Sequence, residues 1–249
     1  MKQSIRGKIL VTRTAKDCEQ WAIQLKKAGA IPVIFPCITC ETIQTTDLNR
    51  MLSEGLKTSD WIVFTSRRGV SAFSSLVEEL GQHELTKKIK IAVVGPATNN
   101  SATQLLGRVD LMSEAGTAKS LGEKLASILQ TKCSVSPPKI LILVAENAGT
   151  IIERTLTASG CECTRLNVYR TVAIKKNTHK QSLSLLDVDK IILASPSAVL
   201  GLTNQVHFDN AVEIFSIGPS TSRAVQAAGL EVTAEAAEPS LKGLMEIMK

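Results

Sequence analysis

Short apolar runs alternate with longer amphipathic segments along the whole chain. The first run covers residues 8–12, a helical pattern follows to about residue 28, and a second run covers residues 31–35. Similar runs occupy residues 61–65, 89–94, 140–144, 163–169, 190–194 and 212–217. These runs are continuous rather than alternating, which is typical of parallel strands with helices on both faces. The pattern therefore predicts an α/β protein.

The same pattern is present twice. Three segments recur in order: residues 8–10 as 139–141, residues 62–66 as 191–195, and residues 94–98 as 217–221. The third pair is the most specific, because Val94-Gly95-Pro96-Ala97-Thr98 recurs as Ile217-Gly218-Pro219-Ser220-Thr221. We therefore expect two copies of one strand-helix module, with the chemistry between them.

Two irregular segments interrupt the pattern and are candidate linkers. One is the Ser- and Pro-rich stretch 131–138, between the two copies, and the other is the polar run 175–180. The repeat alone leaves open which of them separates the spatial domains.

Composition and charge narrow the possible partners. The 249 residues suit two modest domains, and the formal net charge of +6 is spread along the chain. Such a charge favours an acidic small molecule over nucleic acid, and two Trp, one Tyr and five Phe are too few for a base-stacking platform. No stretch approaches the ~18 apolar residues that cross a bilayer, and no signal-type run precedes the first strand. We expect a cytoplasmic protein without membrane contact.

The six cysteines do not resemble a secreted disulfide framework. Cys37 and Cys40, with Cys161 and Cys163, could form a four-thiolate zinc site, although the pairs lie far apart in sequence and lack glycine knuckles. Reduced, mostly buried thiols are the simpler interpretation, and we expect no metal.

Familiar catalytic signatures are missing from the sequence. It contains neither G-x-G-x-x-G after a strand, nor a P-loop, nor H-E-x-x-H, nor G-x-S-x-G. The three histidines stand apart from any nucleophile-base arrangement.

Small polar residues instead gather where strands give way to helices. Parallel strands end at one edge of their sheet, where ligands of such folds bind. Helix N-termini at that edge could hold a polyanion through backbone N–H groups. The alternative is that these residues are ordinary helix N-caps. The candidates are Thr12, Arg13, Ser66, Gly95, Thr98, Ser195, Ser197, Gly218, Pro219, Ser220 and Thr221.

Tyr169 and several arginines follow strand ends. Tyr169 is the only tyrosine, and its phenol could donate a proton or a hydrogen bond at neutral pH, or else simply pack at a domain junction. Arg13, Arg67, Arg68 and Arg170 could contact carboxylates or could be solvated loop charges.

Taken together, these segments resemble the uroporphyrinogen-III synthase family over nearly the whole chain. The resemblance rests on segments 9–13, 60–66 with Val70, 94–95 with Thr98, 168–171, 195–197 and 217–224. Each segment alone is weak evidence for the family, but the order and spacing of the segments are specific to it.

The resemblance implies two flavodoxin-like parallel-sheet domains joined by a two-stranded connector. The first domain would comprise residues 1–36 and 173–249, and residues 37–172 would form the inserted second domain. The repeat boundary is then not the domain boundary, because the first unit of each copy is exchanged.

The resemblance also implies an enzyme without a cofactor. The family closes the linear tetrapyrrole hydroxymethylbilane, losing water through an azafulvene and inverting the last pyrrole ring through a spiro intermediate. Tyr169 would hydrogen-bond to the leaving hydroxyl, Thr221 would orient that group or the substrate, and backbone N–H groups at the other turns would receive acetate and propionate groups.

One turn departs from the family pattern. Where many members carry an Arg-Gly-rich turn, this chain has Val144-Ala145-Glu146-Asn147-Ala148-Gly149, and Glu146 would repel a carboxylate there. We expect a monomer with transient contact to the preceding pathway enzyme. Two alternatives to the enzyme are a non-catalytic two-domain binding protein for an acidic ligand and a scaffold with an exposed apolar patch.

Overall fold

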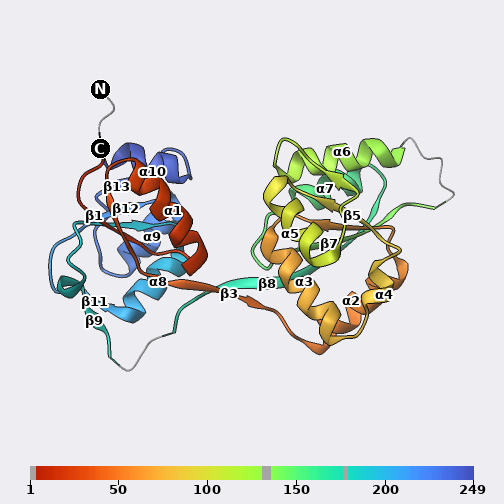
Figure 1. Cartoon of the computed structure of the whole chain (residues 1–249), viewed down its shortest axis with the longest axis horizontal. Coiled ribbons are helices and arrows are strands. Elements are labelled where there is room, and N and C mark those ends of the chain that lie inside the picture. The colour runs from red at the N-terminus through yellow and green to blue at the C-terminus, as the bar shows by residue number, and fades with distance from the viewer. Residues whose placement is uncertain (1–3, 131–135, 176–178) are drawn as a thin grey trace. The chain divides into compact units, whose positions relative to one another are not determined.

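A computed structural model describes residues 4–130, 136–175 and 179–249. The chain forms two compact units: unit 1 is Met1–Cys40 with Thr171–Lys249, and unit 2 is Glu41–Arg170. Figure 1 labels their elements. Parts of both predicted linkers, residues 131–135 and 176–178, lie outside the described residues.

Unit 1 contains a five-stranded parallel sheet in the order β13-β12-β10-β1-β2. Its strands are β1 (Lys8–Val11), β2 (Ile31–Ile34), β10 (Lys190–Leu193), β12 (Glu213–Ser216) and β13 (Ala234–Glu235). Its helices are α1 (Ala15–Lys27), α8 (Pro196–Gln205), α9 (Pro219–Ala227) and α10 (Leu241–Ile247). A small pair, β9 (Gln181–Ser182) with β11 (Val206–His207), and the 3-10 helix η1 (Leu183–Leu186) complete it.

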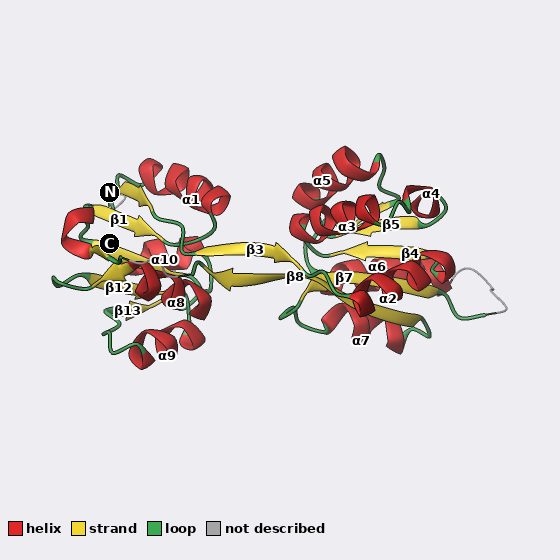
Figure 2. Ribbon diagram, turned by 90° about the horizontal axis from the view of Figure 1, so that it is seen from below, coloured by secondary structure: helices red, strands yellow, loops and turns green. Residues whose placement is uncertain are grey.

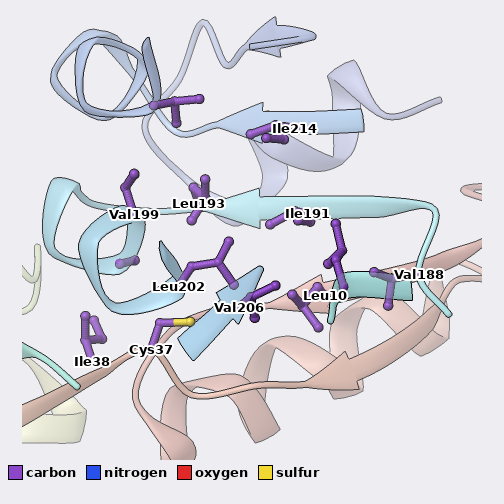
Figure 3. Close-up of a cluster of buried hydrophobic side chains, with 13 residues drawn as sticks. Leu10, Cys37, Ile38, Val188, Ile191, Leu193, Val199, Leu202, Val206 and Ile214 are labelled. Carbon is purple, nitrogen blue, oxygen red and sulfur yellow. The ribbon is translucent and has the colours of Figure 1, made fainter. Parts of the chain in front are cut away.

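Apolar side chains are buried on both faces of this sheet. On one face Leu10 and Leu193 pack with Val199 and Leu202 of α8, as Figure 3 shows. On the other face Ile9 and Val11 join residues of α1 and α10. Successive apolar residues of the central strands β1 and β10 therefore pack on alternate faces, which explains the unbroken hydrophobic runs.

Unit 2 contains a six-stranded sheet in the order β3-β8-β7-β4-β5-β6. Its strands are β3 (Ile38–Thr42), β4 (Trp61–Phe64), β5 (Lys90–Val93), β6 (Leu111–Met112), β7 (Lys139–Ala145) and β8 (Glu162–Ala173). Its helices are α2 (Thr46–Thr58), α3 (Arg67–Glu79), α4 (His83–Thr86), α5 (Pro96–Leu106), α6 (Ala118–Gln130) and α7 (Ile151–Ala158). Figure 2 shows helices flanking the strands within each unit.

Strands β3 and β8 carry the chain between the units. The N–H of Ile43 donates to Val168 O at 3.0 Å, and the N–H of Ile174 donates to Cys37 O at 2.8 Å. Because one partner number rises as the other falls, the two strands are antiparallel. Their neighbours β7, β4, β5 and β6 pair in parallel.

The strand orders reveal how the sequence repeat is distributed. Read from β13 to β2, unit 1 follows the same order as unit 2 read from β6 to β8. In each sheet two neighbouring strands come from one copy of the repeat and three from the other, and β3 is the sixth strand of the unit 2 sheet. The predicted exchange of the first part of each copy is thus present in the topology, and the predicted α/β fold with parallel sheets is confirmed.

No helix among the described residues is long and apolar enough to span a membrane.

Candidate active site

Three predicted turns of unit 1 meet at one sheet edge. Strands β1, β10 and β12 are neighbours and parallel, so the turns after Val11, Leu193 and Ser216 lie side by side at their carboxyl ends. These turns carry the candidates Thr12, Arg13, Ser195, Ser197, Gly218, Pro219, Ser220 and Thr221.

Thr12 and Arg13 are committed to contacts within unit 1. Thr12 is fully buried, and its Oγ1 donates to Ile192 O at 2.7 Å, which ties β1 to β10. The guanidinium of Arg13 pairs with the Asp17 carboxylate at 3.3 Å and stacks over Trp21 at 4.7 Å. Their side chains therefore stabilise the edge of the sheet.

Ser66 and Ser195 are N-caps, the alternative that the sequence left open. Ser66 Oγ accepts from the N–H of Gly69 at 3.0 Å, and Ser195 Oγ accepts from the N–H of Ala198 at 3.1 Å. Each hydroxyl satisfies a donor that helix geometry leaves unpaired. These positions correspond in the two copies of the repeat.

The Gly-Pro turns differ from the serine turns. Among the described residues, no side chain caps the helix that follows Gly95 or the helix that follows Gly218. Gly95 has φ +83°, a conformation that favours glycine. Pro96 and Pro219 have no N–H, and the N–H of Thr221 already donates to Gly218 O at 3.0 Å. The other N–H groups at the start of α5 and α9 are of the kind that helix geometry leaves unpaired, and they lie at the positive end of the helix dipole. Of the predicted turns, these suit carboxylate binding through the main chain.

Thr98 and Thr221 occupy the same place in these two turns and are both buried. Thr221 is 1% exposed, and within the described part of the chain its Oγ1 has no hydrogen-bond partner. The neighbouring Ser222 donates to the carboxylate of Glu235, whereas Ser220 and Pro219 are exposed. An unpaired buried hydroxyl is costly, so stability alone does not explain a threonine at 221.

Tyr169 and Ser66 meet in unit 2. Tyr169 Oη lies 2.9 Å from Ser66 Oγ, although the residues come from β8 and from the turn after β4, with β7 between these strands. The register of β7 and β8 shifts between Val144 and Ala145, so that Ala145 faces Tyr169. This irregularity sets the position of Tyr169 on the strand, and Tyr169 itself is 8% exposed.

The divergent turn after β7 borders Tyr169. The N–H of Glu146 donates to Tyr169 O at 2.9 Å, while the Glu146 side chain is exposed. Thr150, the N-cap of α7, makes no side-chain cap among the described residues. The turn therefore lies next to Tyr169 and forms part of its surroundings.

Arg165 organises this turn and was missed by the sequence analysis. Its Nη2 donates to the carbonyl oxygens of Ala145 at 3.2 Å and Ala148 at 2.9 Å, and its Nη1 donates to Gly149 O at 3.3 Å. Nη1 also pairs with the Glu153 carboxylate on α7. A charged residue in the middle of an apolar strand was the available signal, since such residues are rarely buried unless paired.

Three of the five described cysteines are buried, and Cys40 and Cys163 are half-buried. Cys18, Cys37, Cys40, Cys161 and Cys163 are free. Burial raises the pKa of Cys18 to about 11 and also raises the pKa of Cys37. The described residues contain no group of three or more His, Cys, Asp or Glu that could hold a metal ion.

Comparison with known proteins relates this geometry to a family. The family model described as "Uroporphyrinogen-III synthase HemD" matches residues 19–246. The chain belongs to the uroporphyrinogen-III synthase family. A chloroplastic uroporphyrinogen-III synthase of Oryza sativa subsp. japonica is 31% identical, with 96% of this chain and 78% of that protein covered. The uroporphyrinogen-III synthase of Schizosaccharomyces pombe is 24% identical, over 95% of this chain and 93% of that protein.

Solved structures of family members share the fold. Uroporphyrinogen-III synthetase from Helicobacter pylori has a TM-score of 0.55 at 18% identity, with 96% of this chain and 97% of that chain covered. A mutant synthase from Thermus thermophilus has a TM-score of 0.53 at 15% identity, with 96% of both chains covered. These structures confirm the fold, and the family match over residues 19–246 confirms the family resemblance that the sequence indicated.

Proposed function

We propose that this protein cyclises hydroxymethylbilane to uroporphyrinogen III, with loss of water and inversion of the last pyrrole ring. The observation that carries the proposal is the family match over residues 19–246, which includes both Gly-Pro turns and Tyr169. It makes the protein a cyclising lyase of tetrapyrrole and heme biosynthesis.

Tyr169 is the proposed catalytic acid. The C–O bond of the terminal hydroxymethyl group breaks, its electron pair leaves with the oxygen, and that oxygen takes the phenolic proton and departs as water. The pyrrole nitrogen lone pair forms the ring C=N bond, the ring double bonds shift, and the former hydroxymethyl carbon gains the exocyclic C=C bond of the azafulvene. The pyrrole N–H proton returns to the phenolate. The hydrogen bond to Ser66 holds the phenol in place for this exchange.

The polycarboxylate substrate is held by main-chain donors in this proposal. The uncapped first turns of α5 and α9 receive acetate or propionate groups at Gly95–Thr98 and Gly218–Ser220. Thr221 orients the leaving group or the substrate, because its buried hydroxyl has unused hydrogen-bonding capacity within the described residues. Thr12, Ser195 and Ser197 contribute through the backbone of their turns. Arg13, whose backbone carbonyl accepts from the N–H of Cys37, contributes through the charge of its guanidinium.

Fixing the curled substrate is as important as removing hydroxide, because spontaneous closure without inversion competes. The proposal requires no cofactor. In this proposal the protein is a cytoplasmic monomer that contacts the preceding enzyme of the pathway only transiently.

The test is incubation of the purified protein with freshly prepared hydroxymethylbilane, followed by separation of the product isomers. Isomer III should predominate, and Tyr169→Phe should lower its formation by about a hundredfold. A yield of isomer I alone would contradict the synthase and favour the non-catalytic binding protein. An unchanged rate for Tyr169→Phe would remove this residue from the mechanism.

A further inference from the structure

Ser66 makes two hydrogen bonds that together limit what its hydroxyl can do. Its Oγ accepts from the N–H of Gly69 at 3.0 Å and lies 2.9 Å from Tyr169 Oη. A serine hydroxyl has one proton to donate and two lone pairs. Gly69 occupies one lone pair, so the proton of Ser66 remains available for Tyr169.

The direction of the Ser66–Tyr169 bond decides what the phenol can do. If Tyr169 donates, its only proton is used inside the protein. If Ser66 donates, Oη accepts and the phenolic proton can reach a third group. The Gly69 N–H and the positive end of the α3 dipole draw electron density from Ser66 Oγ, which makes its hydroxyl a better donor. These surroundings strengthen Ser66 as a donor and act against the greater intrinsic acidity of a phenol.

We propose that Ser66 is a positioning residue that donates its proton to Tyr169 Oη and thereby directs the phenolic proton toward the leaving hydroxyl of the substrate. This proposal rests on the proposed function and deepens the role of its acid. Ser66 then acts through Tyr169, and its side chain does not bind a substrate carboxylate.

The proton balance leaves Ser66 unchanged. The phenolic proton moves to the departing oxygen, and the pyrrole N–H proton restores the phenol. Between these transfers Oη is negative, and the hydrogen bond from Ser66 stabilises that charge. Ser66 keeps its own proton throughout.

Three substitutions at Ser66 separate the hydroxyl from the helix cap. Ser66→Ala removes both, Ser66→Gly removes the hydroxyl at a smaller cost to the cap, and Ser66→Thr keeps both. We expect kcat for isomer III to fall about fivefold in the first two variants with KM unchanged, and to stay near wild type in the third.

Ser240→Ala is the matched control for capping. Ser240 Oγ accepts from the N–H of Gly243 at 3.0 Å, the same cap with the same residue types and spacing, at the start of α10. Its loss should lower the melting temperature without changing kcat. If Ser240→Ala lowered kcat as much as Ser66→Ala, capping alone would explain the effect and the proposal would fall.

A double-mutant cycle with Tyr169→Phe tests the coupling. Because Ser66 acts through Oη, Ser66→Ala should leave the residual rate of Tyr169→Phe unchanged. A fivefold loss in both backgrounds would show that Ser66 works independently of Tyr169. A higher KM with unchanged kcat would show that Ser66 binds the substrate directly, and either result overturns the proposal.

A spectroscopic measurement tests the contact without activity. The chain has one tyrosine, so protein labelled with ¹³C at the tyrosine Cζ gives one resonance to follow. This resonance should move in Ser66→Ala and stay in place in Ser240→Ala, and an unmoved resonance in both would refute the hydrogen bond. If the wild-type protein formed only isomer I, the proposed function and this inference would both be overturned. If it formed isomer III but the effects of Ser66→Ala and Tyr169→Phe were independent, only the inference would be overturned.

Discussion

The guanidinium of Arg165 bridges the turn after β7 to the carboxylate of Glu153 on the helix that the turn leads into. Both side chains are mostly shielded from solvent, at 23% and 14% exposure. The same guanidinium donates to backbone carbonyls on both sides of the turn. One side chain on β8 therefore holds a segment that local sequence does not fix.

Arg165→Met should lower the stability of unit 2 by about 2–4 kcal/mol, because it leaves a shielded carboxylate and several carbonyls without their donor. Arg165→Lys should recover little of this, since an ammonium group cannot reproduce the planar fork. Thermal unfolding would measure both. Arg154→Met, at an exposed position of α7, is the control and should change stability by less than about 0.5 kcal/mol. Equal effects at 154 and 165 would contradict the bridging role.

Thr221→Val should preserve or slightly raise stability while lowering isomer III formation. The substitution keeps the side-chain shape and removes a buried hydroxyl that has no partner within the described residues. Melting temperature and product analysis measure the two effects separately.

Thr12→Val is the comparison for Thr221→Val. Here the lost hydroxyl donates to Ile192 O at 2.7 Å in a fully buried place, so stability should fall by about 1–3 kcal/mol. If Thr221→Val destabilised the protein as much as Thr12→Val, the hydroxyl of Thr221 would be structural.

Stability should fall as the pH rises above 9, in part because of Cys18. Burial raises the pKa of its thiol from 9.0 to about 11, so between these values the unfolded chain has lost the proton that the folded chain retains. The contribution of this thiol to stability is fully present below pH 9 and is lost as the pH rises through its folded pKa. Melting temperatures between about pH 8 and 10.5 should decline less steeply for Cys18→Ala than for wild type. Parallel curves would exclude Cys18 as a source of the slope.

Gly201→Ala should destabilise unit 1 by more than about 2 kcal/mol, because a Cβ at this position of α8 would lie 1.8 Å from Cys37 O. Alanine is otherwise the better helix former, so the loss would report the close approach alone. Gly149→Ala, where a Cβ meets nothing within 4 Å, is the control for melting temperature. A stable Gly201→Ala variant would mean that α8 can move away from Cys37.

The sequence predicted those features that depend on local pattern and on repetition. Unbroken apolar runs identified the main parallel strands, and the recurrence of the Gly-Pro turn identified two equivalent helix starts. The short pair β9 and β11 was missed, because strands of two residues have no periodicity. The boundaries at residues 36 and 172 stay a prediction for independently folding domains.

Features that depend on register were beyond the sequence. Ser66 was read as a substrate ligand, yet its partner Tyr169 lies 103 residues away and reaches it across β7. Their meeting depends on the irregularity between Val144 and Ala145, for which the sequence carries no turn signal. The role of Arg165 depends on register too, because its carbonyl acceptors and its partner Glu153 lie on the neighbouring turn and helix rather than on β8.

The pairing of β1 with β10 has a consequence for the order of events on the ribosome. Leu10 pairs in register with Ile191, and the whole of unit 2 lies between them in the chain. Every strand of the unit 2 sheet except the end of β8 has been synthesised once Arg170 emerges, whereas β1 can pair with β2 but still lacks β10, its second neighbour. The first forty residues must therefore wait for β10 and the rest of unit 1, with one edge of β1 unpaired, until most of the chain has been made. Nascent-chain protection, by chaperones or by the early compact unit, would matter most for this amino-terminal segment.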